Sequence, residues 1–124
     1  LDAGKSIDAH VEALLSHSNV ELVVVTLGEV GARGFTRNTS VEVPIYEPEV
    51  FGDTVGAGDS LMAGILTALA DRGAFATGRI GDLAQSELED VLRFGAVTAG
   101  LNCGHIGCHP PSRAEVEAAL ADFR

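Results

Sequence analysis

Basic side chains and cysteines are scarce in this chain. Its 124 residues include 8 Lys and Arg against 18 Asp and Glu, which gives a net charge of −10 at pH 7. A nucleic-acid partner is therefore not expected, because such a partner is bound by a basic face. Two cysteines without a secretion signal do not make a disulfide framework. No apolar run is long enough to span a bilayer, and we predict a cytoplasmic protein with no membrane partner.

The hydrophobic pattern of the first half predicts a helix and a few strands. Apolar residues recur at helical spacing between 6 and 17, which predicts an amphipathic helix. The β-branched run 20–26 hardly alternates with polar residues, which favours a parallel strand buried on both faces. Residues 34–37 and 41–46 are expected to form two short strands joined by the turn Asn38-Thr39-Ser40.

Helices are predicted to fill the second half. Residues 61–70 are apolar nearly all round, which is typical of a buried helix. Ser86 with Glu89 and Ser112 with Glu115 have capping-box spacing and predict the starts of two later helices. One apolar strand cannot pair its own edges, and the chain supplies few partners for it. We therefore expect the chain to be part of a larger α/β domain.

The most informative segment is Asp53-Thr54-Val55-Gly56-Ala57-Gly58-Asp59-Ser60. One interpretation is a glycine-rich turn that only begins a helix. The other is functional, because backbone N–H groups at a helix N-terminus hold an anion and the Asp59 carboxylate can accept a proton. An anion hole beside a base is what phosphoryl transfer to a hydroxyl requires. The sequence has no GxxxxGK[ST] motif, which excludes a P-loop.

This segment resembles the second signature of the PfkB, or ribokinase-like, carbohydrate kinases, D-T-x-G-A-G-D, and matches all six fixed positions. The resemblance implies that Asp59 is the general base for a sugar hydroxyl. It also implies that the backbone of Gly56, Ala57, Gly58 and Asp59 receives the transferred γ-phosphoryl group. The implied fold is a three-layer α/β/α sandwich with a mostly parallel central sheet. Residues 1–124 would be its C-terminal, nucleotide-binding and catalytic end, without the N-terminal sugar-binding part and lid.

Two further segments resemble the family. The stretch Thr26-Leu27-Gly28-Glu29-Val30-Gly31 follows the apolar strand, where open α/β sheets bind ligands. The resemblance implies that Thr26, Gly28 and Gly31 contact ATP. Residues 93–112 are similar to a helix and turn beside the adenine pocket, with Ala96 where many members have Asn or His. The base preference is therefore left open.

The resemblance also implies a monovalent cation, such as K⁺, beside the anion hole. In several members an Asp and backbone carbonyls hold it, and the matching positions here are Asp53, Val55, Asn102, His105 and Gly107. A zinc site is an alternative use of the same loop. Four potential ligands fall within seven positions, although not at a common zinc-finger spacing: Cys103, His105, Cys108 and His109.

Together these features predict ATP-dependent phosphorylation of a sugar hydroxyl, with Mg²⁺ screening the phosphates. The pairs Asn102-Cys103 and Pro110-Pro111 are most similar to fructokinase-type members. Ribose, 2-keto-3-deoxygluconate and nucleosides stay open as acceptors. A nucleotide- or sugar-binding module without turnover is the alternative of another class. We expect residues 1–124 alone to be inactive, because the sugar-binding part lies outside them, and a homodimer of the full-length protein is left open.

Overall fold

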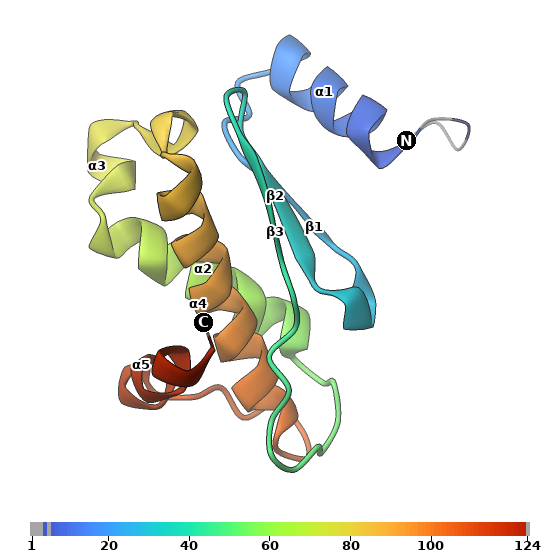
Figure 1. Cartoon of the computed structure of the whole chain (residues 1–124), viewed down its shortest axis with the longest axis vertical. Coiled ribbons are helices and arrows are strands. Elements are labelled where there is room, and N and C mark those ends of the chain that lie inside the picture. Colours follow the sequence, from blue (N-terminus) through green and yellow to red (C-terminus); the bar gives the residue numbers. More distant parts are fainter. Residues whose placement is uncertain (1–3, 5, 124) are drawn as a thin grey trace.

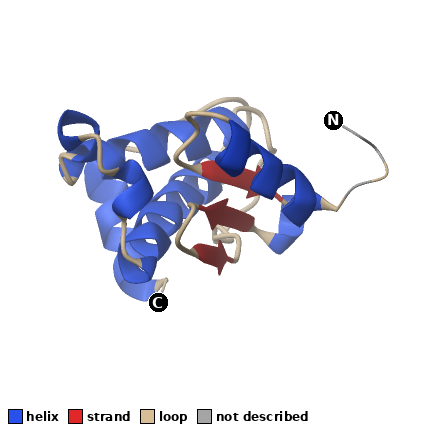
Figure 2. Cartoon of the chain, turned by 90° about the horizontal axis from the view of Figure 1, so that it is seen from above, coloured by secondary structure: helices blue, strands red, loops and turns tan. Residues whose placement is uncertain are grey.

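The computed structural model describes residues 4 and 6–123 as three layers, with a sheet between helices on both faces (Figures 1 and 2). Helix α1 covers one face, and α2 and α4 lie on the other. In chain order the elements are α1 (Ile7–His17), β1 (Val23–Thr26), β2 (Ala32–Phe35), β3 (Ser40–Val43), α2 (Ala57–Asp71), α3 (Ala74–Thr77), α4 (Gln85–Cys103) and α5 (Arg113–Asp122), with 3₁₀ turns at Gly28–Val30 and Ile80–Asp82. The predicted three-layer α/β architecture is confirmed. No helix in the described residues has the length and apolarity needed to cross a membrane.

The side chains of β2 point alternately to the two faces of the sheet, and each face packs against a different helix. Ala32 packs with Leu92 of α4, and a Cβ added at Gly34 would lie 2.8 Å from a methyl carbon of the same leucine. Phe35 points to the opposite face and packs with Leu15 of α1. Because both faces are covered, a slip of one residue would exchange the two sets, so the register is well specified.

The pairing of β1 differs from the expectation. Within the described residues the sheet order is β1-β2-β3, and both pairings are antiparallel. Within the apolar run 20–26 the strand begins at Val23 rather than at Val20, and the valines of this strand are half-buried. The prediction of a parallel strand buried on both faces is therefore corrected. The partner of β1 in the described chain is antiparallel, and no described strand covers its other edge, which leaves its valines half-buried. The expected hairpin is confirmed, with its strands at 32–35 and 40–43.

Helices α2 and α4 pack closely against each other through two glycines. A Cβ added at Gly64 of α2 would lie 2.8 Å from the Cα of Gly95, and one added at Gly95 would lie 2.7 Å from Ile65. The absence of side chains at these two positions lets the two backbones approach.

The outer face of α2 is exposed. Ile65 is 3% exposed, whereas Met62 is 55% and Leu66 45% exposed. The prediction of a helix buried all round is therefore wrong for this face. Met62 and Leu66 line a groove of about 430 Å³ whose other wall includes Leu22 and Val24 of the β1 segment. We call it the β1–α2 groove.

One of the two predicted capping boxes is present. Ser112 and Glu115 exchange the expected bonds, with Ser112 N–H to the Glu115 carboxylate at 2.7 Å and Glu115 N–H to Ser112 Oγ at 3.3 Å. The box at Ser86 and Glu89 is wrong. Helix α4 begins before both, and Glu87 accepts the N–H of the residue that precedes the helix at 3.0 Å.

Candidate active site

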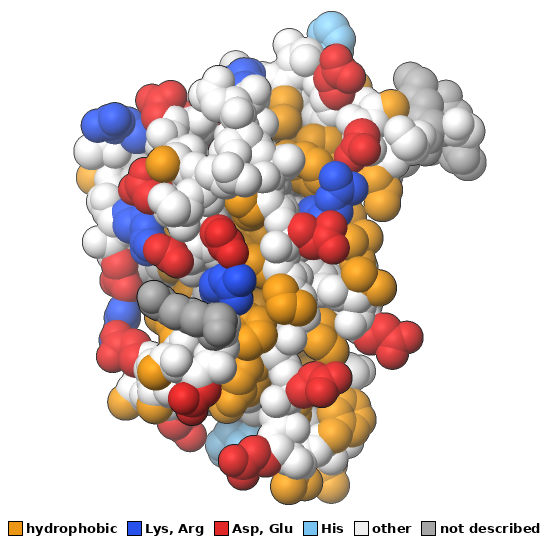
Figure 3. All heavy atoms as spheres, viewed as in Figure 1, with side chains coloured by type: hydrophobic (Ala, Val, Ile, Leu, Met, Phe, Trp, Pro, Cys, Tyr) orange, Lys and Arg blue, Asp and Glu red, His pale blue; other side chains and the backbone are white. Residues whose placement is uncertain are grey.

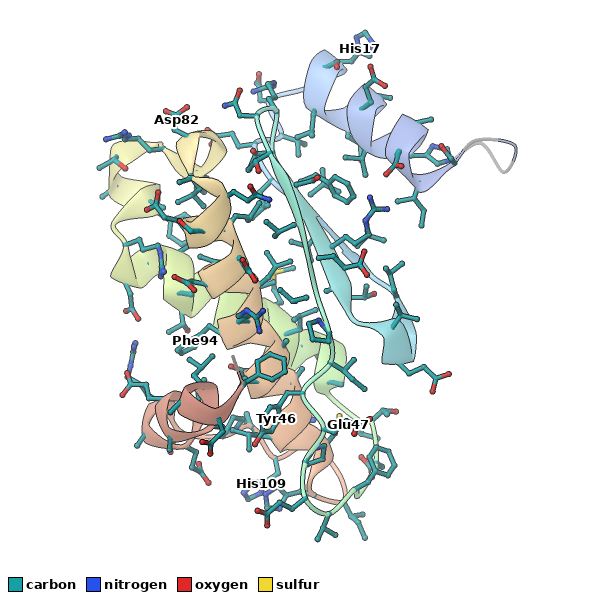
Figure 4. The ribbon with its side chains drawn as sticks, viewed as in Figure 1. His17, Tyr46, Glu47, Asp82, Phe94 and His109 are labelled. Atoms are coloured by element: carbon teal, nitrogen blue, oxygen red, sulfur yellow. The ribbon has the colours of Figure 1, made fainter. Side chains whose placement is uncertain are left out.

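Two loops meet at the lower end of the molecule in Figure 1, residues 50–56 before α2 and 103–109 after α4. Figure 4 shows His109 at this end and His17 at the opposite end. Gly52 N–H donates to the Cys103 carbonyl at 2.7 Å, and Asp53 N–H donates to the His105 carbonyl at 3.2 Å. A Cβ at Gly52 would overlap the His105 backbone. The loops therefore form one structure, which we call the two-loop unit.

The Asp53 carboxylate ties the two loops together. Its Oδ2 accepts the Gly107 N–H at 2.8 Å, and its Oδ1 accepts the Val55 N–H at 3.0 Å. These bonds stabilise the charged form, the one from Gly107 most strongly, and they hold the pKa of Asp53 below its usual value. Asp53 is therefore a charged link between the loops at neutral pH.

Asn102 joins the loops from inside the fold. It lies in the last turn of α4 and is fully buried. Its Nδ2 donates to the Val55 carbonyl at 2.7 Å, and its Oδ1 accepts the His109 N–H at 2.8 Å. Sequence reasoning missed this side-chain role. A polar residue on an otherwise apolar stretch of helix was the available signal, since a buried amide must find partners.

The turn that begins α2 presents free backbone donors. Gly56 is the N-cap with φ +79°, and a Cβ there would lie 2.5 Å from Cys108 Sγ, so glycine is needed both for conformation and for space. Ala57 N–H donates to the Thr54 carbonyl at 3.1 Å. Among the described residues the remaining donors of the predicted anion hole have no acceptor: Gly56, Gly58 and Asp59. We call residues 56–59 the anion turn.

Asp59 stands on the first turn of α2, beside these donors. It is exposed, and its carboxylate has no hydrogen bond or ion pair within the described part of the chain. Gly58 faces open space, since a Cβ added there would meet no atom within 4 Å. An anion placed against the turn would therefore lie next to an unoccupied carboxylate.

The described cysteine and histidine side chains do not gather around one point at which a metal ion could bind. The rings of His105 and His109 stack with their centroids 4.0 Å apart. Cys103 is half-buried, and burial raises the pKa of its thiol. Among the described residues no group of three His, Cys, Asp or Glu side chains is arranged to hold a metal ion, so the geometry gives the zinc alternative no support. The loop is ordered by backbone bonds and ring stacking instead.

The predicted nucleotide contacts fall in different environments. Thr26 ends β1, is exposed, and lines the β1–α2 groove together with Gly58. Gly28 is exposed, whereas Gly31 has φ +126° and is buried where a Cβ would overlap the backbone of β3. Ala96 is 8% exposed in the core between α4 and the sheet. Packing accounts for Gly31 and Ala96, and nucleotide contact at all four positions stays a prediction.

The positions predicted for a monovalent cation all lie in the two-loop unit or the α4 turn beneath it. Both carboxylate oxygens of Asp53 and the carbonyls of Val55, Asn102 and His105 already accept N–H bonds. Gly107 contributes an N–H donor rather than an oxygen to these bonds. Because an oxygen has more than one lone pair, these bonds leave acceptor capacity for a cation, and cation binding stays a prediction.

Apolar side chains form the outer rim of the two-loop unit. Val50, Phe51 and Ile106 are 73%, 64% and 89% exposed, and hydrophobic side chains reach the surface at this end of the molecule in Figure 3. The charge of the site therefore comes from carboxylates and backbone dipoles inside the rim rather than from basic side chains.

Comparison with known proteins agrees with this geometry. The pfkB family carbohydrate kinase model matches residues 2–115. Over 122 residues the chain is 30% identical to probable fructokinase-4 of Arabidopsis thaliana, a match that covers 97% of this chain and 35% of that protein.

Solved structures of two kinases have the same fold. Ribokinase from Giardia lamblia matches with a TM-score of 0.80 and 30% identity, over 94% of this chain and 37% of that one. Fructokinase from Vibrio cholerae O395, with fructose, ADP and calcium ion bound, matches with a TM-score of 0.69 and 27% identity, over 94% of this chain and 35% of that one. The chain thus spans little more than a third of the length of these relatives. The family match over most of the sequence, with the complete D-T-V-G-A-G-D segment at the start of α2, shows that the chain belongs to the pfkB family of carbohydrate kinases.

Proposed function

We propose that this chain is the catalytic end of an ATP-dependent sugar kinase of fructokinase or ribokinase type. The observation that supports the proposal is the anion turn, in which three N–H groups and the Asp59 carboxylate beside them have no partner among the described residues. A module that only binds a ligand has no use for a free carboxylate next to an anion site. The names of the relatives, fructokinases and a ribokinase, support a sugar as the acceptor.

In the proposed reaction Asp59 accepts the proton of a sugar hydroxyl. The hydroxyl oxygen forms a bond to the γ-phosphorus of ATP while the bond to the β-phosphate oxygen breaks, and ADP leaves. The free N–H groups of Gly56, Gly58 and Asp59 stabilise the negative charge on the transferred group, and the α2 dipole adds to their effect. Open space at Gly58 allows a phosphate to reach the backbone.

Two ions belong to the proposal in different ways. Mg²⁺ neutralises phosphate charge when it is bound with ATP. We assign it no residue of this chain, because the described carboxylates do not gather into a metal site. The two-loop unit is the proposed place for K⁺, where the charge of Asp53 and the carbonyl oxygens of Val55 and His105 lie within connected loops.

We also propose that residues 1–124 are the C-terminal part of one larger domain. The match to about a third of each relative supports this, as do the open edge of β1 and the exposed apolar face of α2. In this proposal further strands of the sheet fill the β1–α2 groove, and the isolated segment has no sugar site and is inactive.

The test is Asp59→Asn in the longer protein that contains this sequence. Loss of the base is expected to lower kcat for phosphoryl transfer by about 10²- to 10⁴-fold, while the affinity for ATP is kept because the N–H groups are unchanged. Rates are measured with a panel of sugars, and ATP binding is measured by calorimetry. Asp82→Asn, at an exposed aspartate far from the site, is the matched control (Figure 4). Unchanged rates in Asp59→Asn would contradict the proposal.

A further inference from the structure

We propose that Asn102 is a positioning residue that aims the anion turn. This inference rests on the proposed kinase function. Asn102 touches no predicted substrate position, and it acts through the backbone of Val55, whose carbonyl accepts its Nδ2–H at 2.7 Å.

The geometry of one peptide unit supports this role. The Val55 carbonyl and the Gly56 N–H belong to the same planar trans peptide, so they point in opposite directions. The bond from Asn102 draws the carbonyl toward the interior, below the last turn of α4. The Gly56 N–H is thereby directed outward, where no described residue accepts it. A fixed direction for this donor is what preorganised stabilisation of a phosphoryl group needs.

Polar bonds hold Val55 on both sides. Its N–H donates to the Asp53 carboxylate at 3.0 Å, and its carbonyl accepts from Asn102. Its own side chain is 57% exposed and contributes little packing. The backbone at this position is therefore held by Asp53 and Asn102 rather than by the hydrophobic core.

The amide of Asn102 satisfies both of its partners, whereas a carboxylate at this position would satisfy one. The Val55 carbonyl needs a donor, and the His109 N–H, which reaches Oδ1 at 2.8 Å, needs an acceptor. One partner is an acceptor and the other is a donor, and this difference fixes the orientation of the amide. The side chain is fully buried, so water cannot readily replace either bond.

Asn102→Asp in the longer protein separates the two bonds. The substitution keeps the shape and the acceptor for His109, but it places an oxygen against the Val55 carbonyl. We expect kcat to fall by about 10- to 100-fold, less than the loss of a whole oxyanion donor, with the KM for ATP nearly unchanged.

Thr98→Val is the matched control, since Thr98 is buried one turn earlier on α4 and donates within its own helix. It should lower the urea midpoint of unfolding and leave kcat close to the wild-type value. A kcat for Asn102→Asp that equals the wild-type value, or a loss of the same size in Thr98→Val, overturns the inference.

A second measurement does not depend on turnover. In the glycine-labelled protein, the Gly56 amide resonance should move away from its wild-type position in Asn102→Asp and keep that position in Thr98→Val. A resonance unaffected by the substitution overturns the inference even if no sugar is phosphorylated. Absence of phosphoryl transfer by the wild-type protein would count against the proposed function alone.

Discussion

The two-loop unit and the β1–α2 groove lie on the same chain, and they differ in how complete they are. In the two-loop unit, Asp53 and Asn102 each have two backbone partners, and the loops bond to each other directly. Along the groove, Met62 and Leu66 are about half exposed, and in the described part of the chain one edge of β1 has no strand beside it. The difference teaches that the two-loop unit, the predicted phosphate-binding end of the site, is built from contacts within this chain, whereas the surrounding sheet needs further structure.

Leu66→Lys is expected to give the largest effect on the free energy of unfolding. A small effect in the longer protein would contradict the difference drawn between the β1–α2 groove and the two-loop unit. In the longer protein the lysine would be buried without a partner, at a cost of about 3 kcal/mol or more. In residues 1–124 alone the site is exposed, and we expect a change within about 0.5 kcal/mol. Urea unfolding of both proteins measures the difference, with Ala63→Lys on the exposed surface as the control. Equal, small effects in both proteins would show that the groove stays open.

Gly64→Val tests the inner face of α2, which is already complete. The new side chain would meet the Gly95 backbone, and overpacking of this kind costs about 1–3 kcal/mol. The measurement is the urea midpoint, in the isolated segment as well as in the longer protein. Ala63→Val places the same side chain on the exposed surface of the same helix and should cost less than 1 kcal/mol, roughly the helix-propensity difference. A similar midpoint for both variants would mean that the glycine contact contributes little.

Asp53→Asn is expected to give the smallest effect and sharpens the description of the two-loop unit. The pKa of Asp53 is lowered by folding, so its contribution to stability is complete above the unfolded pKa of about 3.9 and is lost as the pH falls through the folded value. Wild type should therefore be more stable than the variant at pH 7, and the gap should close in acid. Asp71 and Glu115 also have lowered pKa values, but they are present in both proteins. A gap that is independent of pH would rule out this role of the carboxylate.

The parts of the fold that sequence predicts best are those decided by neighbouring residues. The anion turn is one contiguous segment, and the Ser112–Glu115 box acts within one helical turn. The same spacing at Ser86 was misleading, because a single Glu87 bond lets α4 begin earlier. The spacing of residues along the chain cannot show whether Glu87 or Glu89 accepts the backbone N–H at the start of the helix.

Long-range pairing accounts for most of what the sequence could not predict. The apolar run of β1 indicates a strand, but its β-branched residues do not specify an antiparallel partner. The Asn102 contacts were missed for a related reason, since Val55 lies 47 positions away along the chain. The residues on the outer face of α2 are as apolar as those of a buried surface, although nothing in the described residues covers them. Composition alone therefore overestimates the burial of this face.

The bond between Asp53 and Gly107 joins residues 54 positions apart, with the packed pair α2 and α4 between them. Closing so long a loop directly costs considerable chain entropy. Once α2 and α4 have packed against each other through Gly64 and Gly95, the distance between Asp53 and Gly107 that remains to be closed is shorter. Assembly of the anion turn is therefore expected to follow the packing of α2 against α4 during folding, which places the proposed catalytic segment among the last parts of this chain to become ordered.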